Sequence, residues 1–193
     1  MSIRTLYLIR HAQHDRANPN SDEMEGALTP AGEMQADWTA RRLQGLPVQA
    51  IFSSDLRRAQ QTASFLARSF PNLRVHTDRD LRECVPVIPP LQADHFTDLD
   101  PGDVTRQFNQ AERAFARYFH RADSRDEQEI LVTHGNLLRY FVCRSLDLPA
   151  ERWTRLEIYN CGITEFTIES NGRTQLVSHN DSGHLPHYLK TFL

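Results

Sequence analysis

Two histidines of this sequence follow short apolar runs of the kind that form buried strands. Residues 6–9 lead directly into Arg10 and His11, and residues 129–133 lead into His134. Arginine and histidine side chains are suitable donors for a phosphoryl group, because its concentrated negative charge must be met by several fixed cationic or polar groups. The first hypothesis is therefore a site for a phosphoryl group.

His11 is the candidate nucleophile, because a neutral imidazole accepts a phosphoryl group when surrounding cations stabilise the transferred charge. The cations would come from Arg10 and from Arg58, which follows the second expected strand, and His134 would add a further donor. Cleavage of the ester bond also needs an acid that protonates the leaving oxygen and later accepts a proton from water. Glu83, just after the third expected strand, is the candidate for that role. This chemistry requires no metal ion and no other cofactor.

Each of these residues also has an ordinary structural explanation. Neighbouring Arg and His residues occur by chance, and Arg57 and Arg58 would usually be exposed charges of a helix. His11 and His14 are three residues apart, but no zinc motif such as H-E-x-x-H surrounds them, so we expect no metal site. No P-loop or G-x-G-x-x-G motif is present, which disfavours an NTPase or a dinucleotide enzyme. Only the common placement of the residues supports a shared site.

The elements that would bring these residues together alternate between strand and helix. Apolar runs predict strands over residues 6–9, 49–52, 73–76 and 129–133. Capping residues and helical spacing predict helices from Pro30, after residues 53–55, over 103–122 and over 137–146. Open α/β sheets bind ligands at the carboxyl ends of their strands. That rule places His11, Arg58 and His134 along one edge of the sheet.

The final part of the chain changes pattern. Residues 156–159, 164–168 and 175–177 have the composition of antiparallel strands, the last two joined by a hairpin turn at Asn171 and Gly172. The sequence therefore predicts a single domain over residues 1–193, built as a three-layer α/β/α sandwich with a mostly parallel central sheet and an antiparallel C-terminal portion. Residues 85–103 hold four prolines and predict a long irregular surface segment, which we expect to shape the mouth of the site.

The composition is that of an ordinary globular chain. Of 193 residues, 39% are hydrophobic and 24% are charged, and the formal net charge is -3. We therefore expect no general binding to nucleic acid. No apolar run approaches the ~20 residues of a membrane-spanning helix, and no signal-peptide pattern is present, so we expect no membrane partner and a cytoplasmic location. The three scattered cysteines are expected to be reduced thiols.

Five sequence blocks occur in an order shared with a known family: residues 8–13 (LIRHAQ), 28–36 (LTPAGEMQA), 53–62 (SSDLRRAQQT), 81–83 (LRE) and 133–135 (THG). Together they resemble the histidine phosphatase, or phosphoglycerate-mutase-like, superfamily. The resemblance implies that His11 is the phosphorylated nucleophile and that Glu83 is the proton donor. It also implies that Arg10, Arg58 and His134 bind the phosphate, which agrees with the chemistry argued from the residues. Further candidates beside the phosphate or substrate are Gln13, Asn18 and Gly135.

Two positions depart from the pattern of that family. Ala12 stands where the family usually has glycine, so a conformation with positive φ would be strained there. In the loop after Gln13, Asn18 lies one residue from the position at which the mutase branch has an asparagine that lines the phosphate pocket. The backbone of the site must therefore be compatible with alanine at position 12 and with the shifted asparagine in the following loop.

Four further segments are similar to the mitochondrial-type serine/threonine protein phosphatase branch of the superfamily: residues 81–86, 118–123, 136–144 and 180–186. This resemblance implies a metal-independent phosphatase that acts through a phosphohistidine, with phosphoserine or phosphothreonine protein as the expected substrate. That branch carries an N-terminal targeting segment, whereas this sequence begins at its first strand, so the cytoplasmic expectation is kept. The alternatives are a small-metabolite phosphatase or mutase of the same superfamily, and a non-catalytic phosphate-binding scaffold. A homodimer is expected only by analogy with relatives.

A stripe of arginines lies on the helix expected over residues 103–122. Arg113, Arg117 and Arg121 share one face of that helix. The simplest interpretation is a solvated face, and the alternative is a docking surface for an acidic phosphoprotein.

Overall fold

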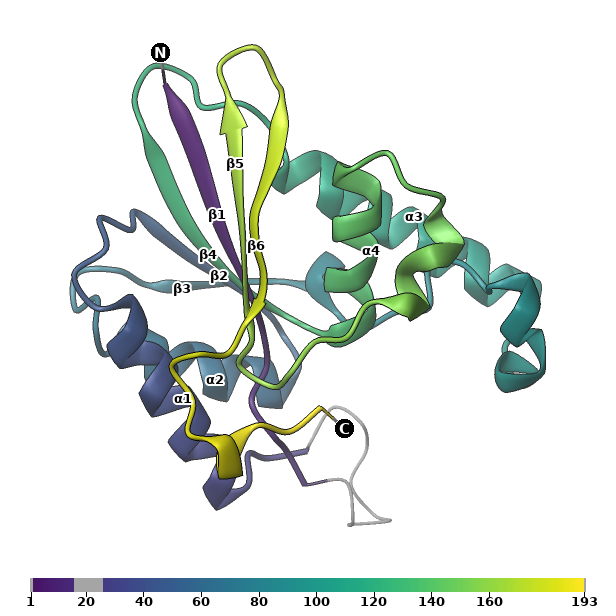
Figure 1. The fold of residues 1–193 in the computed structure, drawn as a ribbon, viewed down its shortest axis with the longest axis horizontal. Helices are drawn as coiled ribbons and strands as arrows, with labels where there is room; N and C mark the ends of the chain where they lie inside the picture. Colours follow the sequence, from purple (N-terminus) through teal and green to yellow (C-terminus); the bar gives the residue numbers. More distant parts are fainter. Residues whose placement is uncertain (1, 16–25, 193) are drawn as a thin grey trace.

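The computed structural model describes residues 2–15 and 26–192 (Figure 1). Its centre is a six-stranded sheet with the strand order β3-β2-β4-β1-β5-β6. The strands are β1 (Ile3–Arg10), β2 (Ala50–Ser54), β3 (Val75–Asp78), β4 (Glu127–Thr133), β5 (Ile163–Glu169) and β6 (Thr174–Asp181). The α-helices are α1 (Pro30–Leu43), α2 (Arg57–Ala67), α3 (Pro101–Tyr118) and α4 (Gly135–Ser145). Short 3₁₀ segments are η1 (Arg79–Leu81), η2 (Pro90–Phe96), η3 (Ala150–Arg155) and η4 (His187–Leu189).

The register of the sheet aligns the carboxyl ends of its central strands. Strands β3, β2, β4 and β1 run parallel, whereas β5 is antiparallel to β1 and β6 is antiparallel to β5. Arg10 of β1 lies opposite Thr133 of β4, and Ser53 of β2 lies opposite Val132. Three neighbouring strands therefore end at one edge of the sheet. The mostly parallel sheet with an antiparallel C-terminal portion is confirmed.

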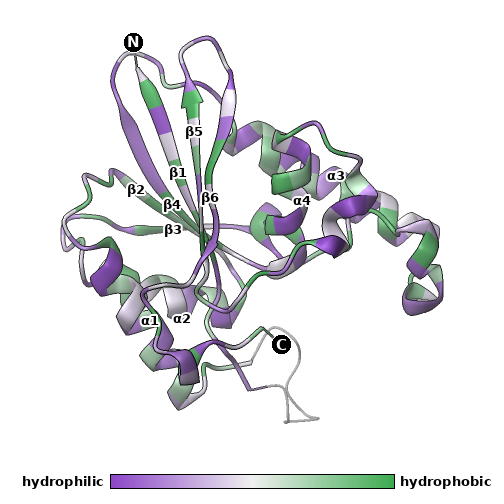
Figure 2. Cartoon of the chain, viewed as in Figure 1, coloured by the Kyte–Doolittle hydropathy of each residue, from purple (hydrophilic) through white to green (hydrophobic). Residues whose placement is uncertain are grey.

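Alternate side chains of the central strands pack against helices on opposite faces of the sheet. Leu8 and Leu131 belong to the core beneath α3 and α4, whereas Ile9 and Val132 belong to the core beneath α1 and α2. Figure 1 shows the two helix pairs on either side of the sheet, and Figure 2 shows that the middle parts of the strands are largely hydrophobic. Each fully buried aliphatic side chain of this kind contributes about 1.5–3 kcal/mol. This packing makes the three-layer α/β/α sandwich that the sequence predicts.

The start of α1 is anchored to the loop that follows β1. Thr29 caps the helix by accepting a hydrogen bond from the backbone N–H of Gly32 at 3.0 Å, and Pro30 occupies the first turn, as the sequence predicts. The Thr29 hydroxyl also donates to Gln13 Oε1 at 2.7 Å. The cap of α1 therefore fixes the position of the chain just after β1.

The prediction of a strand over residues 156–159 is wrong. The carbonyl oxygen of Ile158 accepts a hydrogen bond from the Arg10 guanidinium at 2.6 Å, and the N–H of Tyr159 donates to Asn180 Oδ1 at 2.9 Å. Side chains thus satisfy backbone groups that a neighbouring strand would otherwise pair. The segment is an irregular connection between η3 and β5.

Other differences concern the bounds of elements. Strand β3 covers Val75–Asp78 instead of residues 73–76, and α3 ends at Tyr118 instead of residue 122. The Asp100 side chain caps α3 by accepting from the Asp103 N–H at 2.9 Å. The helix therefore begins at Pro101, before the predicted start at residue 103. Within the part of the chain that the structure describes, no helix combines the length and the apolar character needed to cross a membrane.

Candidate active site

Three residues from different elements meet at the carboxyl edge of the sheet. His11 follows β1, Arg58 lies in the first turn of α2, and His134 lies between β4 and α4. The Arg58 Nε–H donates to His11 Nε2 at 3.3 Å, and the ring centroids of His11 and His134 are 5.0 Å apart. These residues are only 2%, 4% and 0% exposed. The structure therefore brings both imidazoles and one guanidinium of the expected site together.

The hydrogen bonds of His11 define its tautomer. Nδ1 lies 2.8 Å from the carbonyl oxygen of Ala12, which can only accept, so Nδ1 carries the proton. Nε2 faces the N–H of Arg58, which can only donate, so Nε2 presents its lone pair. Burial lowers the pKa of His11 well below its usual range, and the nearby His134 and Arg58 lower it further. His11 is therefore held neutral, with Nε2 available as a nucleophile.

His134 is oriented by the end of β2. Ser54 Oγ accepts from the Leu56 N–H at 3.3 Å, so its hydroxyl proton is available for His134 Nε2, which lies 2.9 Å away. Nδ1 then carries the ring proton, and it is buried without a hydrogen-bond partner among the described residues. Burial lowers the pKa of His134 well below its usual range, and the charges of Arg58 and Arg10 act in the same direction. The ring is thus a neutral donor.

Arg10 is positioned by remote parts of the chain. Its Nη1 donates to the carbonyl oxygens of Ile158 at 2.6 Å and of Phe192 at 3.0 Å. Gly135 lies beside it, because a Cβ added at this position would meet Arg10 Nε and Arg139 Nη2 at 3.4 Å. Gly135 therefore lies in contact range of two guanidinium groups at the start of α4.

Glu83 is held at the N-terminus of α4. Its Oε1 accepts hydrogen bonds from the backbone N–H groups of Asn136 at 3.0 Å and of Cys84 at 3.3 Å. Burial raises the pKa of Glu83, while the charge of Arg10 and the hydrogen bond from Asn136 oppose that rise. A carboxyl group with a raised pKa keeps its proton to higher pH and can donate it to a leaving oxygen.

Two polar residues that sequence reasoning did not assign to the site hold the backbone around His11. Asn160 Nδ2 donates to the carbonyl oxygen of His11 at 2.9 Å, and Thr62 Oγ1 accepts from the Ala12 N–H at 3.0 Å. Thr62 is the last residue of the sequence block over residues 53–62, so the sequence could have indicated its role. Asn160 had no such signal, because it reaches the site from the irregular connection before β5.

The loop after β1 accommodates the departures from the family pattern. Ala12 is fully buried and is not among the described non-glycine residues with positive φ, so this alanine needs no left-handed backbone. The Gln13 side chain accepts from the Thr29 hydroxyl, and its backbone N–H donates to Gln35 Oε1 at 2.8 Å. Gln13 therefore joins the loop to α1. Asn18 lies outside the described residues.

His14 also approaches His11. The ring centroids of His11 and His14 are 5.0 Å apart with an interplanar angle of 83°, which is an edge-to-face contact. Over residues 2–15 and 26–192, no group of three or more His, Cys, Asp or Glu residues is arranged to hold a metal ion. The three cysteines are buried free thiols, as expected.

Comparison with known proteins relates the chain to phosphatases and mutases. It is 38% identical over 193 residues to the human and mouse proteins named serine/threonine-protein phosphatase PGAM5, mitochondrial, an alignment that covers 96% of this chain. The chain spans 65% of the length of these relatives. The fold is also similar to that of a phosphoglycerate mutase from Plasmodium falciparum, with a TM-score of 0.67, 26% identity, and coverage of 97% of this chain and 96% of that chain.

The prediction of a cytoplasmic location is wrong on this comparison, because the human and mouse relatives are both named mitochondrial. The prediction rested on the lack of a targeting segment. Since the chain spans only 65% of these relatives, that lack carries no information about the compartment.

A model of the histidine phosphatase superfamily (branch 1) matches residues 6–86 and 90–182. The matched ranges contain each of the expected catalytic and phosphate-binding residues: Arg10, His11, Arg58, Glu83 and His134. The chain therefore belongs to the histidine phosphatase superfamily.

Proposed function

We propose that this protein is a metal-independent phosphatase that hydrolyses phosphomonoesters through a phosphohistidine intermediate. The observation that carries the proposal is the His11 Nε2 lone pair, held 3.3 Å from the Arg58 guanidinium nitrogen. A nucleophile and a cationic clamp are thus arranged around the position of one phosphoryl group. The proposed roles are nucleophile for His11, phosphate binding for Arg10, Arg58 and His134, and general acid and base for Glu83.

In the first step, His11 Nε2 attacks phosphorus and the bond between phosphorus and the ester oxygen breaks. Glu83 donates its proton to the departing oxygen, so the leaving group departs as a neutral alcohol. Arg10 and Arg58 stabilise the charge on the non-bridging oxygens during transfer. The Ala12 carbonyl, which accepts from Nδ1, stabilises the positive charge that develops on the ring.

In the second step, the Glu83 carboxylate accepts a proton from water while the water oxygen attacks phosphorus. The bond between phosphorus and Nε2 breaks, its electron pair returns to His11, and inorganic phosphate leaves. We assign the buried Nδ1–H of His134 to a phosphate oxygen in both steps, because it has no partner among the described residues. The cycle restores neutral His11 and protonated Glu83.

Phosphoserine or phosphothreonine in a protein is the proposed substrate. This assignment is supported by 38% identity to relatives named serine/threonine-protein phosphatase, of which the chain spans 65%. The likeness to a phosphoglycerate mutase at 26% identity supports the second candidate, a small phosphorylated metabolite. A non-catalytic scaffold is disfavoured because both a nucleophile and an acid are present at the site. A screen of kcat/KM values over phosphopeptides and phosphorylated metabolites separates the two substrate classes.

The mechanism is tested by hydrolysis of an aryl phosphate in excess chelator. We expect the wild-type protein to retain activity and His11→Ala to lose roughly 10³-fold or more, because the variant has no nucleophile. His120→Ala removes an exposed histidine after α3 and serves as the matched control. Vanadate, which mimics pentacoordinate phosphorus, should inhibit tightly. Activity that survives in His11→Ala, or that chelator abolishes in the wild type, would overturn the mechanism.

A further inference from the structure

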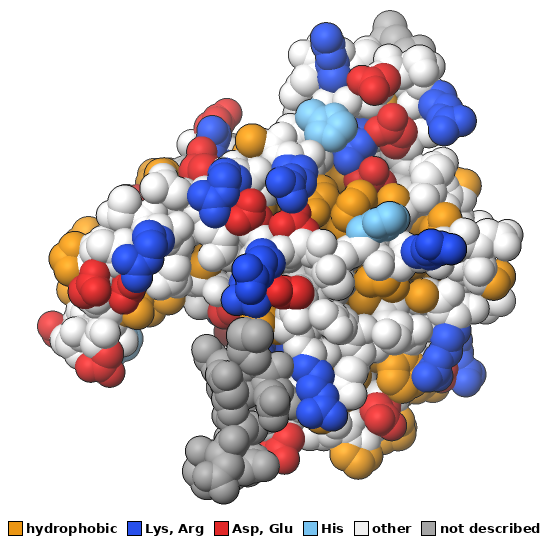
Figure 3. Space-filling view, turned by 180° about the vertical axis from the view of Figure 1, so that it is seen from behind, with side chains coloured by type: hydrophobic (Ala, Val, Ile, Leu, Met, Phe, Trp, Pro, Cys, Tyr) orange, Lys and Arg blue, Asp and Glu red, His pale blue; other side chains and the backbone are white. Residues whose placement is uncertain are grey.

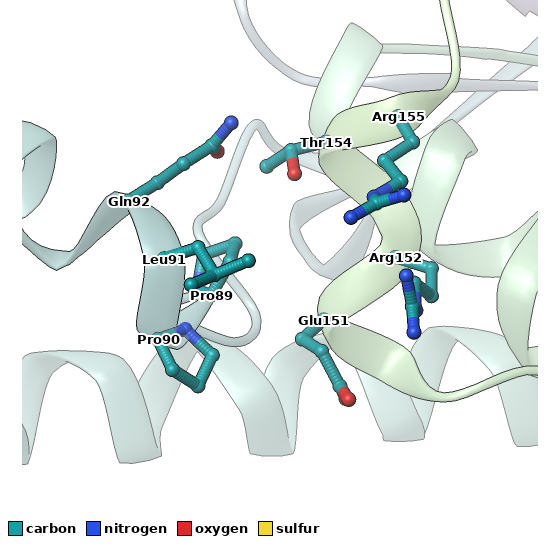
Figure 4. A pocket seen from close by; sticks show the side chains of 8 residues that line it. All are labelled: Pro89, Pro90, Leu91, Gln92, Glu151, Arg152, Thr154 and Arg155. Carbon is teal, nitrogen blue, oxygen red and sulfur yellow. The ribbon is translucent and has the colours of Figure 1, made fainter.

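A groove that the proposed mechanism does not use opens between two 3₁₀ segments. One wall consists of residues 89–92, at the start of η2, and the other of residues from 151–155, in η3 (Figure 4). Its volume is about 350 Å³. Proline and leucine side chains dominate the first wall, and arginines dominate the second. This feature is termed the η2–η3 groove.

The groove is connected to the residues that hold Glu83. Trp153 of η3 donates from Nε1 to the carbonyl oxygen of Val87 at 2.8 Å, which joins η3 to the segment that follows Glu83. The Arg139 guanidinium lies 5.3 Å from the centroid of the Trp153 ring and donates to Asn136 Oδ1 at 2.9 Å. The backbone N–H of Asn136 in turn donates to the Glu83 carboxyl group. Both walls are therefore tied to the anchor of the proposed acid.

The arginine wall of the groove carries charge that the protein does not neutralise. Arg152 and Arg155 are exposed, and neither forms an ion pair with another residue in the described part of the chain. Figure 4 shows the side chains of Arg152 and Arg155 on η3, with Thr154 of the same segment nearer to the wall that carries Leu91. Glu151 is the acidic residue of the lining, so the groove has a net positive charge. Exposed guanidinium groups of this kind can bind carboxylates in a bidentate geometry.

The arginine stripe of α3 differs from the groove in this respect. Arg113 pairs with Asp80 at 2.8 Å, and Arg117 pairs with Asp78 at 2.5 Å. Figure 3 shows basic and acidic side chains interspersed over the face of the molecule that it presents. The stripe is therefore largely neutralised by its own neighbours. An acidic ligand gains more from Arg152 and Arg155 than from arginines that already have carboxylate partners.

The opposite wall of the groove is largely apolar. Leu91 is 89% exposed, the highest value among the exposed large hydrophobic residues of the described chain. Pro89 and Pro90 precede it and offer no N–H groups for strand pairing. This wall can therefore contact apolar side chains but cannot extend a sheet through its prolines. An apolar wall that faces a cationic wall is complementary to a chain with both acidic and apolar side chains.

We propose that the η2–η3 groove binds the polypeptide that flanks the phosphorylated residue of a protein substrate and that it selects acidic flanking side chains. Arg152 and Arg155 pair with carboxylates of the flank, and Leu91 packs against an apolar residue of the same segment. The inference rests on the proposed function and adds a sequence preference to it. A substrate protein is then held at the phosphate pocket and at the groove simultaneously.

The proposal is tested with two phosphoserine peptides of equal length, one with aspartates on both flanks and one with asparagines at the same positions. For the wild type we expect kcat/KM to be about tenfold higher for the acidic peptide, mainly through KM, since two ion pairs of modest strength are gained. Salt should reduce this preference. In R152A/R155A we expect the preference to fall to about twofold or less. Aryl phosphate turnover should be unchanged in this variant.

The matched control is R121A/R125A, which removes two exposed arginines near the start of β4, at the opposite end of the sheet from the site. It should keep the acidic preference. The groove proposal is overturned if the wild type turns over both peptides equally, or if R152A/R155A keeps the preference. Turnover of aryl phosphate without turnover of either peptide refutes the protein substrate, and the groove proposal fails with it. Inactivity on every phosphomonoester instead refutes the phosphatase mechanism itself and, with it, the groove proposal.

Discussion

Replacement of Glu83 with glutamine isolates the proton transfers proposed for this residue. Glu83 Oε1 accepts from the Asn136 N–H at 3.0 Å, and a glutamine oxygen can accept the same hydrogen bond, so the position is kept while the acidic proton is lost. General acid–base catalysis contributes about 10²- to 10⁴-fold, or roughly 3 to 5 kcal/mol at 1.36 kcal/mol per tenfold. We expect a loss of that size in kcat/KM for phosphoserine substrates, because a serine alkoxide is a poor leaving group without a proton.

An aryl phosphate should respond differently to Glu83→Gln. Nitrophenolate leaves without protonation, so transfer to His11 remains fast, whereas release of phosphate lacks its base and becomes slow. Rapid-quench measurements should show a burst of nitrophenol and an accumulated phosphohistidine. The exposed-residue control Glu33→Gln should behave as the wild type. Equal losses of kcat/KM for aryl phosphate and phosphoserine, with no accumulated phosphoenzyme, would refute the assignment of Glu83.

Three other positions give expectations that can be tested. The Arg139 charge lowers the pKa of Glu83, so Arg139→Met should move the basic limb of the kcat/KM profile with phosphoserine to higher pH, and an unmoved limb would contradict this coupling. A Cβ at Gly32 would overlap the Gln13 carbonyl oxygen, so Gly32→Ala should lower the free energy of unfolding in urea by roughly 1–3 kcal/mol; a loss below about 0.5 kcal/mol would show that the loop yields. Burial lowers the pKa of His184 to about 4 in the folded protein, whereas the pKa in the unfolded chain is about 6.5. Between these two pH values the unfolded state binds a proton that the folded state does not bind. The free energy of unfolding therefore decreases as pH falls from about 6.5 towards 4. His184→Gln should reduce this loss by on the order of 1 kcal/mol at pH 5 relative to pH 7 in urea unfolding, and an identical pH dependence in the variant would exclude the linkage.

The parallel strands could be predicted from the sequence because their signal is local. In β1, Leu8 packs towards α3 and α4 while Ile9 packs towards α1 and α2. A strand that is covered on both faces must be apolar at successive positions, and this leaves a continuous run in the sequence. His11 and His134 could be placed for the same reason, since each directly follows such a run and parallel strands end at a common edge.

The supports of the site could not be predicted because they depend on contacts between distant segments. Asn160 donates to the His11 carbonyl and accepts from the Thr191 hydroxyl at 2.9 Å, so its role requires both the β1 loop and the C-terminal segment in place. The mistaken strand over residues 156–159 has the same origin, because the Ile158 carbonyl bonds to a guanidinium from β1. Apolar composition alone does not distinguish a strand from a buried irregular segment whose backbone is satisfied by side chains.

The electrostatics of the site follow from one physical cause acting on three titratable groups. Burial lowers the pKa values of His11 and His134 and raises the pKa of Glu83, so it drives all three towards their neutral forms. Arginine keeps its charge at any accessible pH, so Arg10 and Arg58 bring positive charge to the pocket. A phosphomonoester dianion therefore meets these positive charges, an imidazole with a lone pair on Nε2 and a carboxyl group whose pKa is raised. Burial thus favours the protonation states that the proposed reaction needs.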